Sequence, residues 1–362
     1  MNGIRDMRLV WVLVVVLIVV LAQTSCGDAE QADGGTTTTE AGGDTGARPA
    51  TSIKIGAGRT SSPWFPFGQA LAKFLNEKSE WITAEAVSTA GITGNVDMAK
   101  EKPEEYVAID SFTHIHYFPG DPWSEKRGPY EEQRFIANAS SMTQAIVTYD
   151  PEIKTVADLA GKTVDVGRKG AANTPDMKAI LEAYGVLNDV DLVYTGYGGG
   201  AEKLRDGMVD ASFMLFDHTY PRDFAKGALI EKLETRGPIY YVGLERDKLL
   251  DLRAQKHAIV PVRVPAGALD EETQPEELWA YDDPTFFMAD PAMDEDVVYE
   301  ITRVIWETPA EEWKKWHPTG AHMTEEFKPA MPSLEFYDVH PGAKKFYDEQ
   351  GVEMRDLAEL LE

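Results

Sequence analysis

The sequence has one cysteine among 362 residues, and few basic residues for its length. A lone cysteine, Cys26, excludes an internal disulfide. The 35 Lys and Arg stand against 61 Asp and Glu, which gives a formal charge of −26. A surface of this sign repels nucleic acid and anionic headgroups, so we expect no nucleic-acid partner. The chain is 43% hydrophobic, which is ample for a core, and its length suggests about two domains.

Motifs of common enzymes and metal sites are also missing. There is no Gly-x-Ser-x-Gly, no Walker loop, no His-Glu-x-x-His and no candidate cysteine nucleophile. His114 and His116 share one face of an extended segment, but no third ligand joins them. The acidic residues between Asp290 and Asp296 lack the glycine-centred spacing of a calcium loop. We therefore expect no metal, no cofactor and no enzymatic activity.

The N-terminal segment resembles an export signal. Arg5 and Arg8 precede an apolar run over 9–22, which is too short to span a membrane comfortably but suits a signal core. We expect 1–25 to be a signal peptide. The residues Gln23-Thr24-Ser25-Cys26 resemble a bacterial lipobox, although such boxes usually have an aliphatic residue at the position of Gln23. Acylated Cys26 would hold an exported protein at the outer face of the cytoplasmic membrane; the alternatives are an uncleaved anchor or plain secretion into the periplasm.

The next segment, 26–52, has almost no bulky apolar side chains. It cannot bury enough surface to offset the entropy of ordering, so we expect a flexible tether. Its r.m.s. reach is on the order of 25–30 Å. Such a tether suits a module that exchanges a diffusible ligand with a membrane partner.

From residue 53 onward, strand, loop and helix patterns alternate, which indicates α/β layers with parallel sheets. The predicted strands are 53–57, 81–87, 106–109, 145–149, 163–166, 192–194, 209–215 and 259–264. A loop at 198–200 is expected to precede a helix over 201–206. The strand at 259–264 should return the chain to the first domain, and the remainder should be helical, with a helix over 295–307 capped by Asp294.

These patterns predict two lobes, with 53–141 and 258–362 in lobe I and 142–257 in lobe II. Loops at the carboxyl ends of parallel strands from both lobes should face one crevice, where ligands of open α/β sheets bind. Closure about a hinge would bury the ligand.

The stretch 163–185 carries the sharpest expectation of a binding site. A short strand leads through a glycine-bearing turn to Thr174 and Pro175, which favour a helix start. Unpaired N–H groups at the positive end of this helix suit an anion, most simply a carboxylate. The alternative is an ordinary crossover that holds only water.

Five loops resemble those of one family. They are 56–68, 89–95, 159–164 with Gly167 and Gly170, 264–267, and the His-Pro-Gly-Ala segment at 340–343. Together they are similar to the TAXI group of solute-binding proteins, the extracytoplasmic receptors of TRAP transporters. The resemblance implies a two-lobed periplasmic-binding-protein fold of type II-like topology with a central cleft and hinge. It also implies a small, carboxylate-bearing ligand, delivery to the membrane subunits of a TRAP-type permease, and a monomer.

The candidate ligand-binding residues lie in these loops and at neighbouring strand ends. They are Thr60, Trp64, Phe65, Thr89, Ile92, Thr93, Asn95, Asp110, Gly170, Ala171, Asn173, Thr174, Phe216 and Asp217. The rings could wall the pocket or plug the core, and the hydroxyl and amide groups could donate to a ligand or cap their own turns. Arg168 and Lys169 could pair with a carboxylate, but we expect both to face solvent. His340 is expected to form a structural corner.

Two departures from the family pattern bear on the ligand. The family usually has Gly-Ser-Gly-Thr where this chain has Gly170-Ala171-Ala172-Asn173, and a serine where it has Ile92. The loss of two hydroxyl groups makes the predicted pocket more apolar. The ligand would then be larger or less oxygenated than glutamate or 2-oxoglutarate.

Two other functions stay open at this point. One is a secreted hydrolase or lyase that uses Asp110, Asp217 and His218 as acid–base groups. The other is an accessory lipoprotein that binds no ligand.

Overall fold

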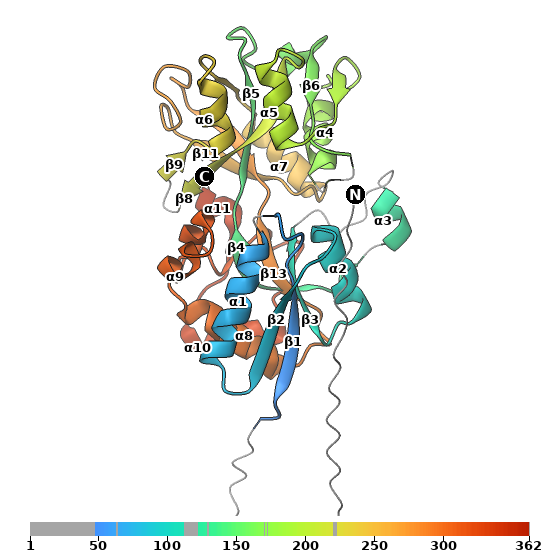
Figure 1. Cartoon of the computed structure of the whole chain (residues 1–362), viewed down its shortest axis with the longest axis vertical. Coiled ribbons are helices and arrows are strands. Elements are labelled where there is room, and N and C mark those ends of the chain that lie inside the picture. The colour runs from blue at the N-terminus through green and yellow to red at the C-terminus, as the bar shows by residue number, and fades with distance from the viewer. Residues whose placement is uncertain are drawn as a thin grey trace, which may run out of the picture. The chain divides into compact units, whose positions relative to one another are not determined.

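The described part of the chain builds two large sheets, each covered by helices, and a small sheet of two short strands (Figure 1). The computed structural model describes residues 48–62, 64–111, 122–128, 130–169, 171, 173–219 and 223–361. The predicted signal peptide, Cys26, the tether before residue 48, and the pair His114 and His116 lie outside the described residues. The part of the chain that begins at Arg48 forms one compact unit.

The first sheet has the strand order β2-β1-β3-β13-β4. Its strands are β1 (Thr51–Gly56), β2 (Ile82–Val87), β3 (Tyr106–Ser111), β4 (Arg134–Ser140) and β13 (Thr285–Ala289). β1, β2 and β3 are parallel, as predicted, whereas β13 runs antiparallel to both of its neighbours. We call this sheet and its helices the first lobe.

Helices cover the first sheet because each presents one apolar stripe. They are α1 (Trp64–Lys78), α2 (Ile92–Glu101), α8 (Glu295–Glu307), α9 (Ala310–Lys314) and α10 (Pro341–Gln350). α1, α8 and α10 pack with β1, β3 and β13 around the fully buried Trp313, whose ring stacks on Phe67. Alternate residues of β13 face opposite sides, with Phe287 in this core and Phe286 in a second cluster. The Asp294 cap of α8 is present as predicted, since its carboxylate accepts from two N–H groups of the first turn.

The second sheet, with its helices the second lobe, has the order β11-β12-β5-β8-β6-β7. Its strands are β5 (Thr143–Thr148), β6 (Thr163–Asp165), β7 (Asp191–Val193), β8 (Ala211–Thr219), β11 (Val260–Val264) and β12 (Leu278–Asp282), with β9 (Asp223–Ala225) on β8 and β10 (Tyr240–Val242) on β5. The helices are α4 (Thr174–Ala183), α5 (Tyr197–Arg205), α6 (Ala228–Glu234) and α7 (Arg246–Ala254). α4 and α7 share one apolar cluster, and α5 and α6 share another.

The remaining described elements are short. They are α3 (Pro122–Arg127), η2 (Val156–Leu159), η3 (Pro318–His322), β14 (Ala330–Met331), β15 (Arg355–Asp356) and α11 (Leu357–Leu361). No helix in the described ranges combines the length and apolar character needed to cross a bilayer.

Three sequence-based expectations for the fold were wrong. β11 does not return the chain to the first sheet, because it pairs with β12, which pairs with β5 of the second sheet. The region after β11 is not wholly helical, since β12 and β13 follow. The expected loop at 198–200 lies inside α5. Glycine suits that helix start, because a Cβ on Gly200 would lie 2.5 Å from the Ser212 hydroxyl oxygen of β8.

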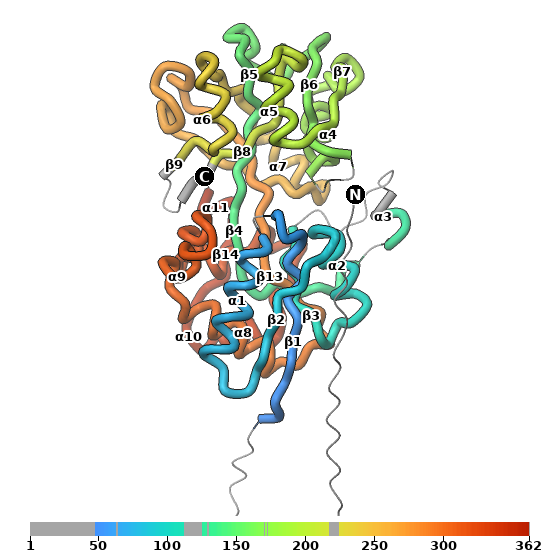
Figure 2. The backbone as a smooth tube through the Cα atoms, viewed as in Figure 1, coloured from blue at the N-terminus to red at the C-terminus, as the bar shows by residue number. Residues whose placement is uncertain are grey.

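The chain crosses between the sheets through two segments that run side by side (Figure 2). Ser141 and Met142 join β4 to β5, and Asp283 and Pro284 join β12 to β13. The Asp283 N–H donates to the Met142 carbonyl at 3.3 Å, and the Ser141 hydroxyl donates to the Asp282 carboxylate at 2.5 Å. The crossing is therefore a narrow two-stranded connection.

The His-Pro-Gly-Ala segment starts α10. His340 is fully buried; its Nδ1 accepts from the Gly342 N–H at 3.2 Å, and its Nε2 donates to the Asp290 carbonyl at 3.3 Å. Gly342 lies directly against the backbone of α8, where a Cβ would overlap the Glu295 carbonyl oxygen and lie 2.8 Å from the Tyr299 nitrogen. The segment is a packing corner.

Substituting alanine for Gly342 should therefore force α10 away from α8. We expect the free energy of unfolding to fall by roughly 1–3 kcal/mol, the usual cost of overpacking. Gly237→Ala is the matched control, because a Cβ at Gly237 meets no atom within 4 Å. Urea denaturation of both variants measures the difference, and equal stability would contradict the close contact of the two helices.

Candidate functional site

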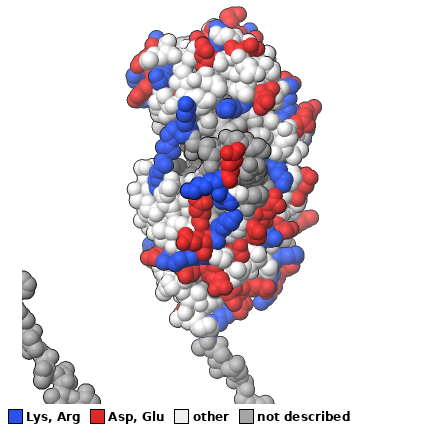
Figure 3. All heavy atoms as spheres, turned by 90° about the vertical axis from the view of Figure 1, so that its right-hand side faces the viewer, with Lys and Arg blue, Asp and Glu red and all other residues white. Residues whose placement is uncertain are grey.

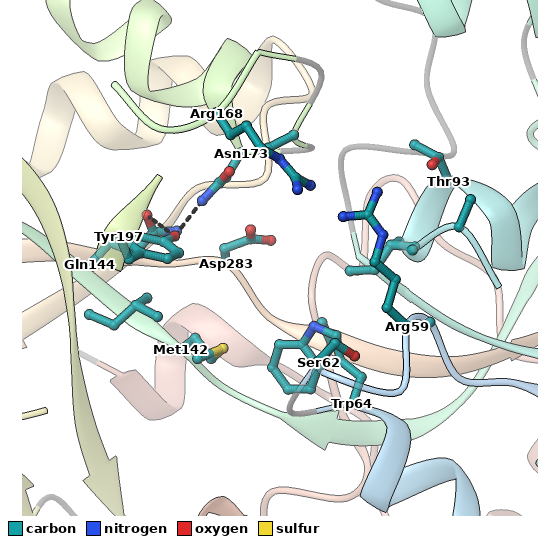
Figure 4. A pocket seen from close by; sticks show the side chains of 17 residues that line it. Arg59, Ser62, Trp64, Thr93, Met142, Gln144, Arg168, Asn173, Tyr197 and Asp283 are labelled. Carbon is teal, nitrogen blue, oxygen red and sulfur yellow. Dashed lines mark hydrogen bonds between the residues drawn. The ribbon is translucent and has the colours of Figure 1, made fainter. Parts of the chain in front are cut away.

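A cavity of about 370 Å³ lies where the crossing segments meet loops of both lobes (Figure 4). This volume is within the range of small-molecule sites. Its lining residues are Gly58, Arg59, Ser62, Trp64, Ala90, Gly91, Ile92, Thr93, Met142, Gln144, Arg168, Ala171, Asn173, Tyr197, Leu215, Asp283 and Thr285.

The first-lobe wall consists of the β1–α1 and β2–α2 loops, which one amide side chain holds together. Asn95 is buried, and its Oδ1 accepts from the Gly58 N–H at 2.9 Å and from the Thr89 hydroxyl at 2.6 Å. Its Nδ2 donates to the Ile109 carbonyl of β3 at 2.6 Å. Gly91 precedes α2 with a φ of 127°, which a residue with a Cβ rarely adopts. Asn95 thus fixes the position of the loop that carries Arg59.

The second-lobe wall is the turn between β6 and α4, again held by a buried polar side chain. Asp165 accepts from the Gly167 N–H and from the Thr195 N–H, each at 3.0 Å, which ties the turn after β6 to the turn after β7. The Thr174 hydroxyl donates to the Arg168 carbonyl at 2.8 Å. These bonds position Arg168 and Asn173 at the cavity.

Four helices begin at this cavity. Trp64, Ile92 and Tyr197 are the first residues of α1, α2 and α5, and Asn173 immediately precedes α4. The N-terminal turns of helices carry partial positive charge and spare N–H groups. The loops predicted at the strand ends therefore share one cavity. The helix N-termini alone give this cavity a positive electrostatic potential.

Two arginine side chains add formal positive charge. Arg59 comes from the first lobe and Arg168 from the second, and both guanidinium groups point into the space between the lobes (Figure 4). Both side chains are exposed, and among the described residues neither forms a hydrogen bond or an ion pair. Unpaired guanidinium groups that face one space can bind a carboxylate or a similar planar anion through paired N–H donors.

A hydrogen-bonded chain fixes the polar groups opposite Arg59 (Figure 4). The buried Gln144 accepts at its Oε1 from the Tyr197 hydroxyl at 2.9 Å and from the Tyr281 hydroxyl at 3.0 Å. The Tyr197 hydroxyl in turn accepts from the Nδ2 of Asn173. The Gln144 oxygen is therefore held by two donors, and the side chain forms part of the cavity lining.

Two carboxyl groups lie at the crossing, the buried Asp282 and the half-buried Asp283. Asp283 lines the cavity, and its Oδ1 is buried without a hydrogen-bond partner. Burial, and then the neighbouring Asp176, Asp282 and Asp110, raise the pKa of Asp283 well above its ordinary value. Burial raises the pKa of Asp282 to about 7, although bonds from Ser141, Met142 and Thr143 oppose the shift. The base of the cavity therefore favours protonated carboxyl groups at neutral pH.

Five of the predicted ligand-binding residues line the cavity: Trp64, Ile92, Thr93, Ala171 and Asn173. The others described here lie elsewhere. Thr60 is exposed outside the lining, Phe65 packs against the first-lobe core, and Asp110 and Phe216 are fully buried. Thr89 and Thr174 bond within their turns, and Asn95 bonds to Gly58, Thr89 and Ile109. Gly170 and the side chains of Asp217 and His218 are not among the parts of the chain that the structure describes.

Sequence reasoning missed several lining residues, above all Arg59, Gln144, Tyr197 and Asp283 as site groups. It considered Arg168 as a carboxylate partner but expected it to face solvent; Arg168 is exposed and also lines the cavity. A polar Gln144 at the start of an apolar strand, and paired aspartates before Pro284, were the available indications.

The sequence model of the NMT1-like family matches residues 55–351. The chain belongs to this family. It is also similar to the aliphatic sulphonate binding protein SsuA from Escherichia coli, at 14% identity, with 86% of this chain and 91% of that chain covered and a TM-score of 0.45. A TctC solute binding protein from Polaromonas matches at 13% identity, with 84% and 90% covered and a TM-score of 0.47. The alkanesulfonate-binding SsuA from Xanthomonas axonopodis pv. citri, bound to MOPS, matches at 12% identity, with 87% and 96% covered and a TM-score of 0.44.

The role of Asn95 can be tested by Asn95→Asp. A carboxylate cannot donate to the Ile109 carbonyl, so two buried acceptors would face each other, and we expect a loss of roughly 1–3 kcal/mol in unfolding free energy. Asn76→Asp is the control, because exposed Asn76 makes the same kind of paired bonds to the Ala84 backbone at 2.8 and 2.9 Å. If thermal denaturation showed an equal loss of stability in both variants, Asn95 would not be the residue that holds the two loops together.

The raised pKa of Asp282 predicts a pH dependence of stability. The unfolded carboxyl releases its proton near pH 4, while the folded one holds it to about pH 7. The folded state thus binds the extra proton in this window, so the contribution of Asp282 to stability is lost as pH rises from about 4 through 7, by up to about 1.4 kcal/mol per unit. In Asp282→Asn this loss should be smaller. Urea denaturation at pH 5 and 8 measures it, and identical slopes would refute the assignment.

Proposed function

We propose that this protein is an extracytoplasmic solute receptor that captures a small, carboxylate-bearing molecule in the cavity between its lobes. The observation that carries the proposal is the pair Arg59 and Arg168, one from each lobe, which face one cavity without a partner among the described side chains. An anion held by both would connect the lobes and exclude water. A ligand that bound both arginines only in a closed form would shift the population toward closure.

The crossing supports a hinge. Among the described residues, the segments at Met142 and Asp283 join β4 to β5 and β12 to β13, and both line the cavity. Rotation there would change the separation of Arg59 and Arg168, and the chain between α10 and α11 would have to bend with it, because α11 packs on β11 of the second lobe. The proposed lobes are 53–141 with most of 258–362, and 142–257 extended by β11 and β12.

The finer assignment rests on the sequence. The five loops that resemble the TAXI group support a receptor that delivers its ligand to a TRAP-type permease. The segment before residue 27 supports export and a lipid anchor at Cys26, which the chain 27–52 would tether. Labelling cells with a fatty-acid analogue, with Cys26→Ala as the control, tests the anchor.

The hydrolase or lyase alternative gains no support from the site. Asp110 is fully buried, its Oδ1 accepts from the Ser111 N–H at 2.7 Å, and it does not line the cavity. A substrate in the cavity would meet Asp283 instead.

Replacing both arginines should abolish ligand binding. Each charge-assisted hydrogen-bonded pair is worth roughly 1.5–3 kcal/mol, so Arg59→Ala and Arg168→Ala should each weaken binding by roughly 10-fold or more. Isothermal titration calorimetry with a panel of small organic acids measures this effect. Arg355→Ala removes an exposed arginine outside the cavity and should bind as the unaltered protein does.

Native mass spectrometry of the purified protein gives an independent result. A co-purified acid that is absent from the double variant would support the proposal. Wild-type binding in both arginine variants would overturn it, and chemical conversion of the acid would favour an enzyme.

A further inference from the structure

We propose that the ligand is a zwitterion, with its anionic group between Arg59 and Arg168 and a protonated amine against Asp283. This inference rests on the proposed function, because it assigns the ligand class of the same cavity. It depends on how charge is distributed from the open side of the cavity to its base.

The open side is positive. Arg59 and Arg168 are exposed, come from loops before α1 and α4, and direct their guanidinium groups into the cavity (Figure 4). Neither forms an ion pair with Asp283 among the described contacts, although all three side chains point into the same space. The two positive groups are therefore available to an anion from solution.

The base is acidic. Asp283 is half-buried at the crossing, deeper than the arginines, and it lines the cavity with no hydrogen bond to its Oδ1. The neighbouring acidic side chains of Asp176, Asp282 and Asp110 raise the pKa of Asp283 further. The Asp176 carboxylate lies 2.8 Å from the His257 Nδ1, whereas Asp283 faces the cavity. The raised pKa keeps the Asp283 carboxyl protonated when no cation lies beside it, and an ammonium group there would favour the ionised carboxylate and form an ion pair with it.

These carboxyl groups do not form a metal site. In the described ranges, no three His, Cys, Asp or Glu side chains are placed to hold a metal ion. An organic cation fits better, because an ammonium group binds through hydrogen bonds from its N–H donors to acceptors and needs no set of three ligating side chains. Asp283 supplies the acceptor.

Part of the cavity wall suits an apolar chain. Trp64, Ile92, Met142 and Leu215 line the cavity. A dicarboxylate would place its second anionic group among these apolar side chains or at the base, and no basic side chain besides Arg59 and Arg168 is among the described residues that line the cavity. An acid with an amine and an apolar body matches the two arginines, the acidic groups at the base and the apolar wall together.

The test compares each amino acid with its deaminated acid. The probes are L-phenylalanine with 3-phenylpropanoate, L-leucine with 4-methylpentanoate, and L-glutamate with glutarate, titrated calorimetrically into the protein. At least one amino acid should bind roughly 10- to 100-fold more tightly than its deaminated partner. Asp283→Asn should bring this ratio close to one. Asp290→Asn, which changes a half-buried aspartate outside the cavity, should leave the ratio unchanged.

We compare the ratio of the two affinities because a variant with a damaged fold would bind both ligands more weakly, by the same factor. Deaminated acids that bind as tightly as the amino acids, or an Asp283→Asn variant with an unchanged ratio, would overturn this inference and leave the receptor proposal intact. If neither series binds, and no acid co-purifies, both proposals fail.

Discussion

The antiparallel contact between the two crossing segments is the constraint on which the site depends. Met142 and Asp283 meet backbone to backbone at the point where β4 becomes β5 and β12 becomes β13. Each lobe folds around its own apolar core, and this connection holds the loops of one core opposite those of the other. The cavity is therefore a consequence of topology, and its base is made by the residues of the crossing itself.

The sequence predicted what local patterns determine. The units β1–α1, β2–α2 and β6–α4 follow from alternating apolar residues, a glycine-bearing turn and a capped or proline-led helix start. The cap at Asp294 and the apolar face of α8 are of the same kind. Because the carboxyl ends of parallel strands lie at one edge of a sheet, these units also placed Trp64, Thr93 and Asn173 near a common crevice.

The rest depends on pairings distant in sequence. β13 is buried on both faces, so it shows no alternation that would mark a strand. The orientation of Gln144 depends on Tyr197 and Tyr281, which reach it from other elements. The glycines at 198–200 suggested a loop, but they lie in α5, and the missing side chain of Gly200 lets this helix approach β8. Arg168 looked solvent-facing because no local pattern shows that another lobe lies opposite.

The charge of the whole chain also constrains what the cavity can select. Acidic and basic side chains are interspersed over the face shown in Figure 3, and the net formal charge is −26. At physiological salt, interactions between exposed charges are screened beyond about 8 Å, so Arg59 and Arg168 attract an anion only at short range. Because of this screening the net charge acts only weakly on a ligand, but its sign disfavours a dianion more than a zwitterion, which has no net charge. For the zwitterion proposed above, the surface charge and the side chains that line the cavity therefore select in the same direction.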